Sequence, residues 1–204
     1  MTSDSIENLS NENRTFAPSA EFAALANGKA DLYAQADADR LKFWEEQAGA
    51  LTWQKKWETV LDWTSPFAKW FVGGKLNATV SALDRHIADG NGERIAFHIE
   101  GESGDTRTIT YAQLLQDVSQ AANALTEIGI TAEDRVAIYM PLIPEAVVAM
   151  LACARIGAVH SVVFGGFSAD ALLSRIQDAD AKLVITADGG FRKGSAFALK
   201  PAVD

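Results

Sequence analysis

Two glycine-rich segments in the carboxyl-terminal half carry residue types that can hold an anion. The first is Phe164-Gly165-Gly166-Phe167-Ser168, and the second runs from Asp188 to Ser195. Paired glycines let a ligand approach the backbone, and a following helix start offers free N–H groups to an anion. In the second segment, Arg192 and Lys193 add a planar fork of donors and a point charge on a flexible, glycine-rich loop. The alternatives are a tight turn that needs glycine dihedrals and a solvated surface loop.

The other reactive residue types do not form a catalytic group. His86, His98 and His160 fall on different expected elements without ligand-like spacing, so we expect no metal site. Cys153, the single cysteine, lies in an apolar run and is expected to be a buried, inert thiol. No Ser-His-Asp arrangement and no Walker-type phosphate loop is present, so we assign no catalytic residue.

Hydrophobic patterns around the two segments predict the elements that position them. Strands are expected at 136–139, 159–164 and 182–186, with one helix starting at Pro144 and another capped by Ser168. Strand, helix, strand, helix, strand with short links is typical of a parallel sheet with crossover helices. Because ligands gather at the carboxyl ends of parallel strands, loops 164–168 and 187–195 should share one edge. They should lie near one another if their strands are neighbours.

Upstream of this sheet, the patterns predict three regions and an α/β chain overall. Residues 1–18 are polar and expected to be disordered, and 19–76 form a helical, Trp-rich extension. Residues 77–204 are expected to begin a large α/β domain with a parallel β-α-β-α-β sheet. Within these regions we expect helices from Ser19, over 29–50 and from Asn77 to Ala88, a hairpin over 94–109, and a helix capped by Thr110 and Gln113. The helix over 29–50 should bury Leu32, Tyr33, Ala36, Leu41, Phe43 and Trp44.

The tryptophans lie close together in the extension. All five occur between Trp44 and Trp70, and we interpret them as anchors by which an irregular segment packs against a larger body.

Composition narrows the class of protein. The 204 residues are 48% hydrophobic and carry a formal net charge of −9, the profile of a globular, acidic chain. Such a chain repels phosphate backbones, so nucleic acid is not expected as a partner. The polar N-terminus does not resemble a signal peptide, and Pro141, Pro144, Glu145 and Arg155 interrupt the most apolar stretch. We therefore expect no membrane span and a cytoplasmic location.

Several runs, read together, resemble the AMP-forming acetyl-CoA synthetases, which are adenylate-forming enzymes. Specific runs are 150–168, which reads MLACARIGAVHSVVFGGFS, and LVITAD at 183–188. Shorter matches are Trp70-Phe71, Leu76-Asn77, Leu83 to His86, and RVAIYMP at 135–141. The resemblance extends over about residues 20 to 204. Propionyl-CoA synthetases are similar.

The resemblance implies a two-step ligase reaction. Acetate attacks the α-phosphate of MgATP to give acetyl-adenylate and pyrophosphate, and the CoA thiol then takes the acetyl group and releases AMP. By position, Phe164, Gly165 and Gly166 match the segment that lines the CoA site. Arg192, Lys193, Gly194 and Ser195 match an Arg-x-Gly-Arg/Lys stretch that meets the phosphate-bearing nucleotide end of CoA. Ser195 departs from that pattern, where a cation is usual, and Lys193 is expected to substitute for it.

The resemblance also implies that these 204 residues are the amino-terminal part of a longer ligase. The triphosphate loop, the acyl pocket and the magnesium site of the family have no counterpart here, so the chain alone is expected to be inactive. The expected partners are acetate, ATP, CoA and the remainder of the same polypeptide. Two alternatives stay open: a propionyl-CoA synthetase, and a non-catalytic module that binds CoA or a partner subunit.

Overall fold

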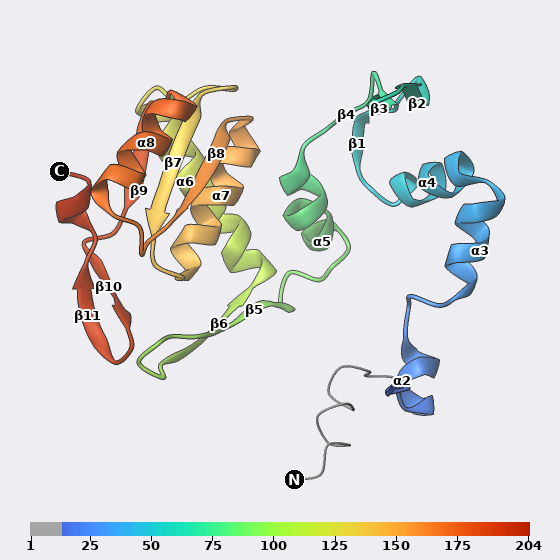
Figure 1. Ribbon diagram of the computed structural model, residues 1–204, viewed down its shortest axis with the longest axis horizontal. Coiled ribbons are helices and arrows are strands. Elements are labelled where there is room, and N and C mark those ends of the chain that lie inside the picture. The colour runs from blue at the N-terminus through green and yellow to red at the C-terminus, as the bar shows by residue number, and fades with distance from the viewer. Residues whose placement is uncertain (1–13) are drawn as a thin grey trace, which may run out of the picture. The chain divides into compact units, whose positions relative to one another are not determined.

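The computed structural model describes residues 14–204, and these contain both helices and strands (Figure 1). The chain divides into two compact units, one ending at Ala48 and the other beginning at Gly49. Residues 1–13 of the tail predicted at 1–18 lie outside the described residues. Residues 14–18 are exposed and form neither helix nor strand.

The first unit is helical, with α2 (Ala20–Leu25), α3 (Asp31–Ala38) and α4 (Arg40–Gly49). Ser19 caps α2 as predicted, because its side chain accepts a hydrogen bond from the Phe22 N–H. The single helix predicted over 29–50 is wrong. Asp39 adopts an extended conformation that ends α3, and its carboxylate accepts a hydrogen bond from the Lys42 N–H at 2.9 Å. An aspartate that satisfies a free N–H in the first turn of a helix favours a new start at that point.

Burial along these helices also differs from the prediction. Tyr33, Leu41 and Trp44 are exposed, with exposed fractions of 78%, 42% and 46%. Leu32, Ala36 and Phe43 are half-buried.

The tryptophan-rich segment is regular, which corrects the prediction of an irregular one. It contains β1 (Trp53–Lys55), β2 (Thr59–Thr64), β3 (Phe67–Val72) and β4 (Lys75–Leu76). β2 pairs antiparallel with β3, and β1 with β4. Trp57 is buried, and its ring lies 4.8 Å from the Trp53 ring and 5.1 Å from the Phe71 ring between centroids. Trp63 is half exposed, so not every tryptophan is an anchor.

A helical segment and a hairpin lead into the sheet. The segment comprises a π-helical turn, η1 (Val80–Asp84), and α5 (Arg85–Ala88), and the Asn77 side chain caps its start by accepting the Thr79 N–H at 3.0 Å. The predicted hairpin is present as β5 (Ile95–Glu100) and β6 (Thr106–Thr110). It is followed by α6 (Tyr111–Glu127), which opens with the predicted capping box of Thr110 and Gln113.

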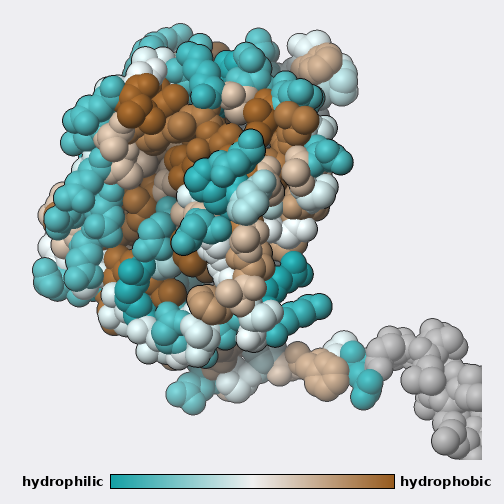
Figure 2. All heavy atoms as spheres, turned by 90° about the vertical axis from the view of Figure 1, so that its left-hand side faces the viewer, coloured by the Kyte–Doolittle hydropathy of each residue, from teal (hydrophilic) through white to brown (hydrophobic). Residues whose placement is uncertain are grey.

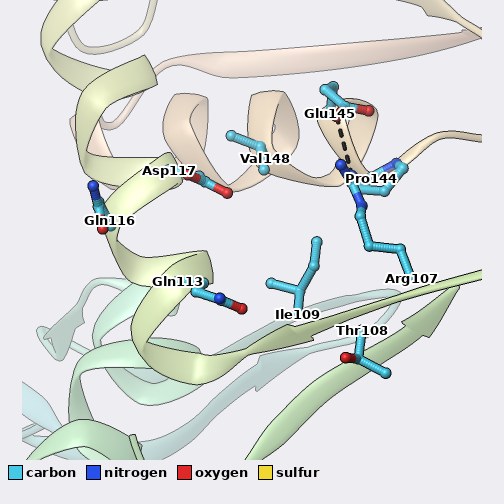
Figure 3. A pocket seen from close by; sticks show the side chains of 9 residues that line it. All are labelled: Arg107, Thr108, Ile109, Gln113, Gln116, Asp117, Pro144, Glu145 and Val148. Carbon is cyan, nitrogen blue, oxygen red and sulfur yellow. Dashed lines mark hydrogen bonds and ion pairs between the residues drawn. The ribbon is translucent and has the colours of Figure 1, made fainter. Parts of the chain in front are cut away.

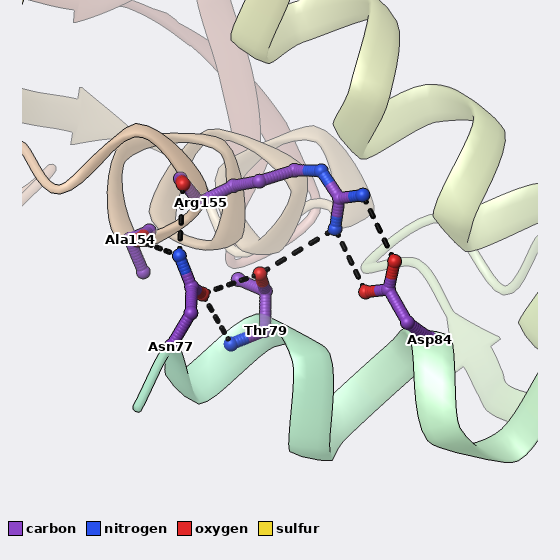
Figure 4. A network of polar contacts seen from close by, with 5 residues as sticks. All are labelled: Asn77, Thr79, Asp84, Ala154 and Arg155. Carbon is purple, nitrogen blue, oxygen red and sulfur yellow. Dashed lines mark hydrogen bonds and ion pairs between the residues drawn. The ribbon is translucent and has the colours of Figure 1, made fainter. Parts of the chain in front are cut away.

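Polar contacts fix the segment after Asn77 to the end of α7 (Pro144–Ile156), as Figure 4 shows. The Arg155 guanidinium donates two hydrogen bonds to the Asp84 carboxylate, at 2.8 and 2.9 Å. Asn77 Nδ2 donates to the Arg155 carbonyl at 2.9 Å. The hydrogen bonds from Arg155 lower the pKa of Asp84, and the carboxylate raises the pKa of Arg155.

Three parallel strands in the order β8-β7-β9 form the sheet of the second unit. They are β7 (Arg135–Met140), β8 (Val159–Phe164) and β9 (Leu183–Thr186). β7 is central, and its residues 136–139 are all buried. α6 and α7 pack on one face, where Val136 and Ile138 join the core, and α8 (Ala169–Ala179) packs on the other through Leu172 and Tyr139 (Figure 1).

Cys153 lies fully buried in the core between α7 and the sheet, as predicted, and its burial raises the pKa of the thiol.

After β9 the chain forms a second hairpin, β10 (Gly189–Arg192) and β11 (Ser195–Ala198), and ends with the short helix η2 (Lys200–Ala202). The flexible loop predicted for these residues is therefore wrong. Residues 189–192 and 195–198 pair in register, and only Lys193 and Gly194 make the turn. Both have positive φ, 53° and 76°, the backbone of the two-residue turns that match strand twist.

Candidate functional site

The two predicted segments meet at the carboxyl edge of the sheet. β8 ends at Phe164, and β10 begins three residues after the end of β9. β7 separates β8 from β9, so the two strands are not neighbours. The segments nevertheless come together, because the hairpin carries Arg192 back over Phe164. The Arg192 guanidinium lies 5.3 Å from the centre of that ring.

Close approach, not a special dihedral, explains the paired glycines. Neither Gly165 nor Gly166 has a positive φ, so the alternative of a turn that needs glycine dihedrals is wrong. A Cβ on Gly165 would lie 3.2 Å from the Met140 carbonyl oxygen. A Cβ on Gly166 would lie 2.5 Å from the Phe164 ring and 2.8 Å from Arg192 Nη1. Gly166 therefore provides the space in which the two segments contact each other, and Gly165 lets the chain pass close to the end of β7.

Two aromatic rings that contact each other lie between two arginines along this edge. Arg192 lies over Phe164, Phe164 and Phe167 pack edge to face at 5.8 Å, and the Arg175 guanidinium lies 4.3 Å from the Phe167 ring centre. Contacts of a guanidinium with a ring face hold the cation in place without neutralising it. Arg175, on α8, was not among the predicted site residues. Its position, seven residues after the cap at Ser168, is a sequence signal that places it two turns into the helix.

Tyr139 contacts the glycine segment from the central strand β7, and it was also not among the predicted site residues. It lies on the central strand with 2% of its surface exposed, and its hydroxyl donates to the Phe167 carbonyl at 2.9 Å. The Gly165 carbonyl lies 3.4 Å from the same hydroxyl. A tyrosine in an otherwise apolar central strand is the signal that could have identified it, because a buried hydroxyl needs a partner.

The predicted cations are free to meet a ligand. Within residues 14–204, neither the Arg192 guanidinium nor the Lys193 ammonium forms an ion pair. Ser195 faces Arg192 across the hairpin, and its hydroxyl donates to the Arg192 carbonyl at 3.3 Å. Ser195 therefore stabilises the turn, while Arg192 and Lys193 carry the positive charge.

A shallow cavity of about 490 Å³ lies elsewhere, between β6, α6 and α7 (Figure 3). None of its lining residues belongs to the predicted site. Its one ion pair joins Arg107 and Glu145 at 3.1 Å, and both side chains are about half exposed. We assign this cavity no function.

No three His, Cys, Asp or Glu side chains come together as a metal site anywhere in residues 14–204. No helix in the same part of the chain is long and apolar enough to cross a membrane.

The fold and this edge define an α/β protein whose sheet presents cations and glycines at the carboxyl ends of its strands. Comparison with known proteins specifies the class. The model of the AMP-binding enzymes matches residues 84–203, and the model of the acetyl-coenzyme A synthetase N-terminus matches residues 29–82. The chain belongs to the AMP-binding enzyme family.

Curated relatives agree with the resemblance predicted from the sequence. An acetyl-coenzyme A synthetase of Streptomyces avermitilis is 63% identical over 205 residues, which cover 100% of this chain and 31% of the relative. Those of Mycobacterium tuberculosis H37Rv and Deinococcus radiodurans are 59% and 52% identical, over 93% and 98% of this chain. The predicted resemblance is confirmed, and the chain spans about a third of the length of these relatives.

Proposed function

We propose that the polypeptide carrying this chain is an AMP-forming acetate–CoA ligase, and that the edge formed by residues 164–166 and 192–195 is part of its CoA site. The observation that carries the proposal is the close approach of Arg192 to Gly166 and to the Phe164 ring, which brings the two segments together. In an acidic chain, this edge presents two cations that form no ion pair within residues 14–204, beside the exposed Phe164 ring. These are the features that a phosphate-bearing nucleotide requires.

In the proposed reaction this chain binds and orients CoA. Acetate and MgATP give acetyl-adenylate and pyrophosphate, and the CoA thiol then displaces AMP. Arg192 would hold a phosphate of the nucleotide end through its planar fork, and Lys193 would add charge in place of the cation that Ser195 lacks. Phe164, half exposed, offers an apolar edge to the same ligand.

Further parts of the polypeptide are proposed to cover the sheet. Within the described residues, β8 pairs on one side only, and Val159 and Val162 on that strand are each more than half exposed. Figure 2 looks onto the side of α8 and the β10–β11 hairpin, where hydrophobic residues gather between polar ones. Exposed apolar strand surface of this kind is usually buried by a neighbour. We propose that the sheet begins a large α/β domain and that the polypeptide is cytoplasmic.

Substrate-dependent pyrophosphate release tests the ligase assignment. The full polypeptide that contains these residues should release pyrophosphate from ATP when acetate is added, and consume CoA in the second step. Release with propionate in preference to acetate would assign a propionyl-CoA synthetase. CoA binding without pyrophosphate release would assign a non-catalytic module.

Charge substitutions test the site. Arg192→Ala together with Lys193→Ala should weaken CoA binding by at least about tenfold, because each phosphate contact with a charged group contributes about 1.5–3 kcal/mol. Arg107→Ala is the matched control, since it removes an exposed arginine outside the site. Equal CoA affinity in both variants would contradict the assignment. Ser195→Lys should tighten CoA binding, because it restores the family's cation.

A further inference from the structure

The tips of two hairpins that are distant in sequence touch beside the proposed CoA site. Glu102 lies in the connection between β5 and β6, and its Oε1 accepts a hydrogen bond from the Lys193 backbone N–H at 2.6 Å. The two residues are 91 positions apart. The tips of the β5–β6 and β10–β11 hairpins lie side by side in Figure 1.

The connection that carries Glu102 is itself braced. The Gly101 N–H donates to the Asp105 carbonyl at 2.8 Å, and the Gly104 N–H donates to the Gly101 carbonyl at 2.9 Å. The Ser103 hydroxyl adds a bond to the Asp105 carboxylate at 2.5 Å. Glu102 therefore extends from a formed turn, and it can restrain the turn that it contacts.

The bond uses a backbone N–H and leaves the cationic side chains available. Lys193 is the first of the two turn residues, so the ladder of β10 and β11 does not use its N–H. A carboxylate is a strong acceptor for such a group. A two-stranded hairpin is only marginally stable alone, so a second attachment point limits the positions its turn can occupy.

We propose that Glu102 is a positioning residue for CoA, which anchors the Lys193–Gly194 turn and so fixes where Arg192 and Lys193 present their charges. This inference rests on the proposed function. Without the anchor, CoA binding must also order the turn, and that entropy reduces affinity. A carboxylate that acted only by repelling the anionic ligand would have the opposite effect on the Kd for CoA, and the test separates the two.

The test measures CoA binding to the full polypeptide by calorimetry, for the wild type, two variants of Glu102 and one control variant. Glu102→Ala should raise the Kd for CoA by about fivefold, the size expected when a binding segment must be ordered. Glu102→Gln keeps an oxygen acceptor of the same length and should stay within about twofold of the wild type. Glu100→Ala removes an equal charge from the adjacent strand β5 and should leave the Kd unchanged. The thermal unfolding midpoint should be the same in all four proteins.

Other outcomes overturn the inference. An unchanged or lower Kd in Glu102→Ala would show that the carboxylate does not anchor the turn for CoA. A loss in Glu102→Gln equal to that in Glu102→Ala would assign the effect to charge. Arg192→Ala separates this inference from the proposed function. If Arg192→Ala weakens CoA binding and Glu102→Ala does not, only the inference fails, and if neither does, both fail.

Discussion

The two edges of the parallel sheet differ in how they use charge. At the amino edge, before β7 and β9, the charged side chains are paired. Lys182 contacts the Asp134 carboxylate, and Arg135 donates to the Ala179 carbonyl at 2.9 Å and to Asp180 at 2.5 Å. At the carboxyl edge, Arg192 lies against a phenylalanine ring and, within residues 14–204, forms no ion pair. Paired charges contribute to the fold, whereas unpaired cations stay available to a ligand.

Arg155 and Arg192 give the clearest contrast. Arg155 makes a bidentate pair with Asp84, and its side chain is only 27% exposed. Arg192 is exposed, and its guanidinium donors are not used by the contacts of the site. We therefore expect substitution of Arg155 to reduce stability and substitution of Arg192 to reduce affinity for CoA.

Arg155→Ala should lower the free energy of unfolding by about 2 kcal/mol, because it leaves a partly buried carboxylate without its partner. Denaturant unfolding of the full polypeptide measures it. The double variant with Asp84→Ala should lose less than the sum of the single variants, since both remove one interaction. An unchanged CoA affinity per folded molecule would support the separate roles of Arg155 and Arg192, whereas a large loss of CoA binding would contradict them.

Arg192→Ala should show the reverse pattern. We expect the Kd for CoA to rise about tenfold, which is about 1.4 kcal/mol, with a change in unfolding free energy within about 0.5 kcal/mol. Calorimetric titration and denaturant unfolding of the same sample give both numbers. A stability loss as large as that of Arg155→Ala would mean that the carboxyl edge is also built for the fold.

Tyr139→Phe should affect both properties, because Tyr139 links the core to the glycine segment. Loss of its hydroxyl removes the hydrogen bond to the Phe167 carbonyl, which should lower the free energy of unfolding by about 1 kcal/mol. CoA affinity should fall slightly, by about threefold, as the segment becomes less ordered. If stability falls and the Kd for CoA does not change, the hydroxyl serves the fold only.

At the amino edge, the contacts of Asp134 should make the free energy of unfolding depend on pH in the acid range. Lys182, followed by the N–H and hydroxyl of Thr131, lowers the pKa of Asp134 to about 2 from its ordinary value of 3.8. A lowered folded-state pKa means that this stability is fully present above about pH 4 and is lost as the pH falls toward 2. Asp134→Asn should therefore flatten the stability profile in that window, and an unchanged profile would contradict the assignment.

Local patterns predicted much of the fold because their causes lie within a few residues. Thr110 and Gln113 satisfy each other's backbone groups three positions apart, and the side chain of Ser168 accepts the Ala171 N–H. Such signals need no distant partner. Asp39 gives a signal of the same kind. Hydrophobic spacing alone predicts one helix over 29–50, but the aspartate caps a second helix and so divides it.

Contacts between distant residues could not be predicted in this way. The pair of Asp84 and Arg155 joins residues 71 positions apart, and the bond of Glu102 to Lys193 spans 91. Tyr139 meets the glycine segment only because β7 and β8 lie in register. In the hairpin over 189–198, the Lys193-Gly194 turn depends on neighbouring residues. The position of the hairpin over Phe164 depends on contacts with residues far away in the sequence.

From the residues alone follow the family resemblance, most of the helices and strands between residues 77 and 186, and which residue types could hold an anion. These follow from residue identity, spacing and short-range hydrogen bonding. Only the folded chain shows that Arg192 reaches Phe164 across an intervening strand, and that Arg155 has a carboxylate partner while, within residues 14–204, Arg192 has none. Those outcomes depend on strand order and on which surfaces pack together, and the free energy of that packing is shared among residues that are far apart along the chain.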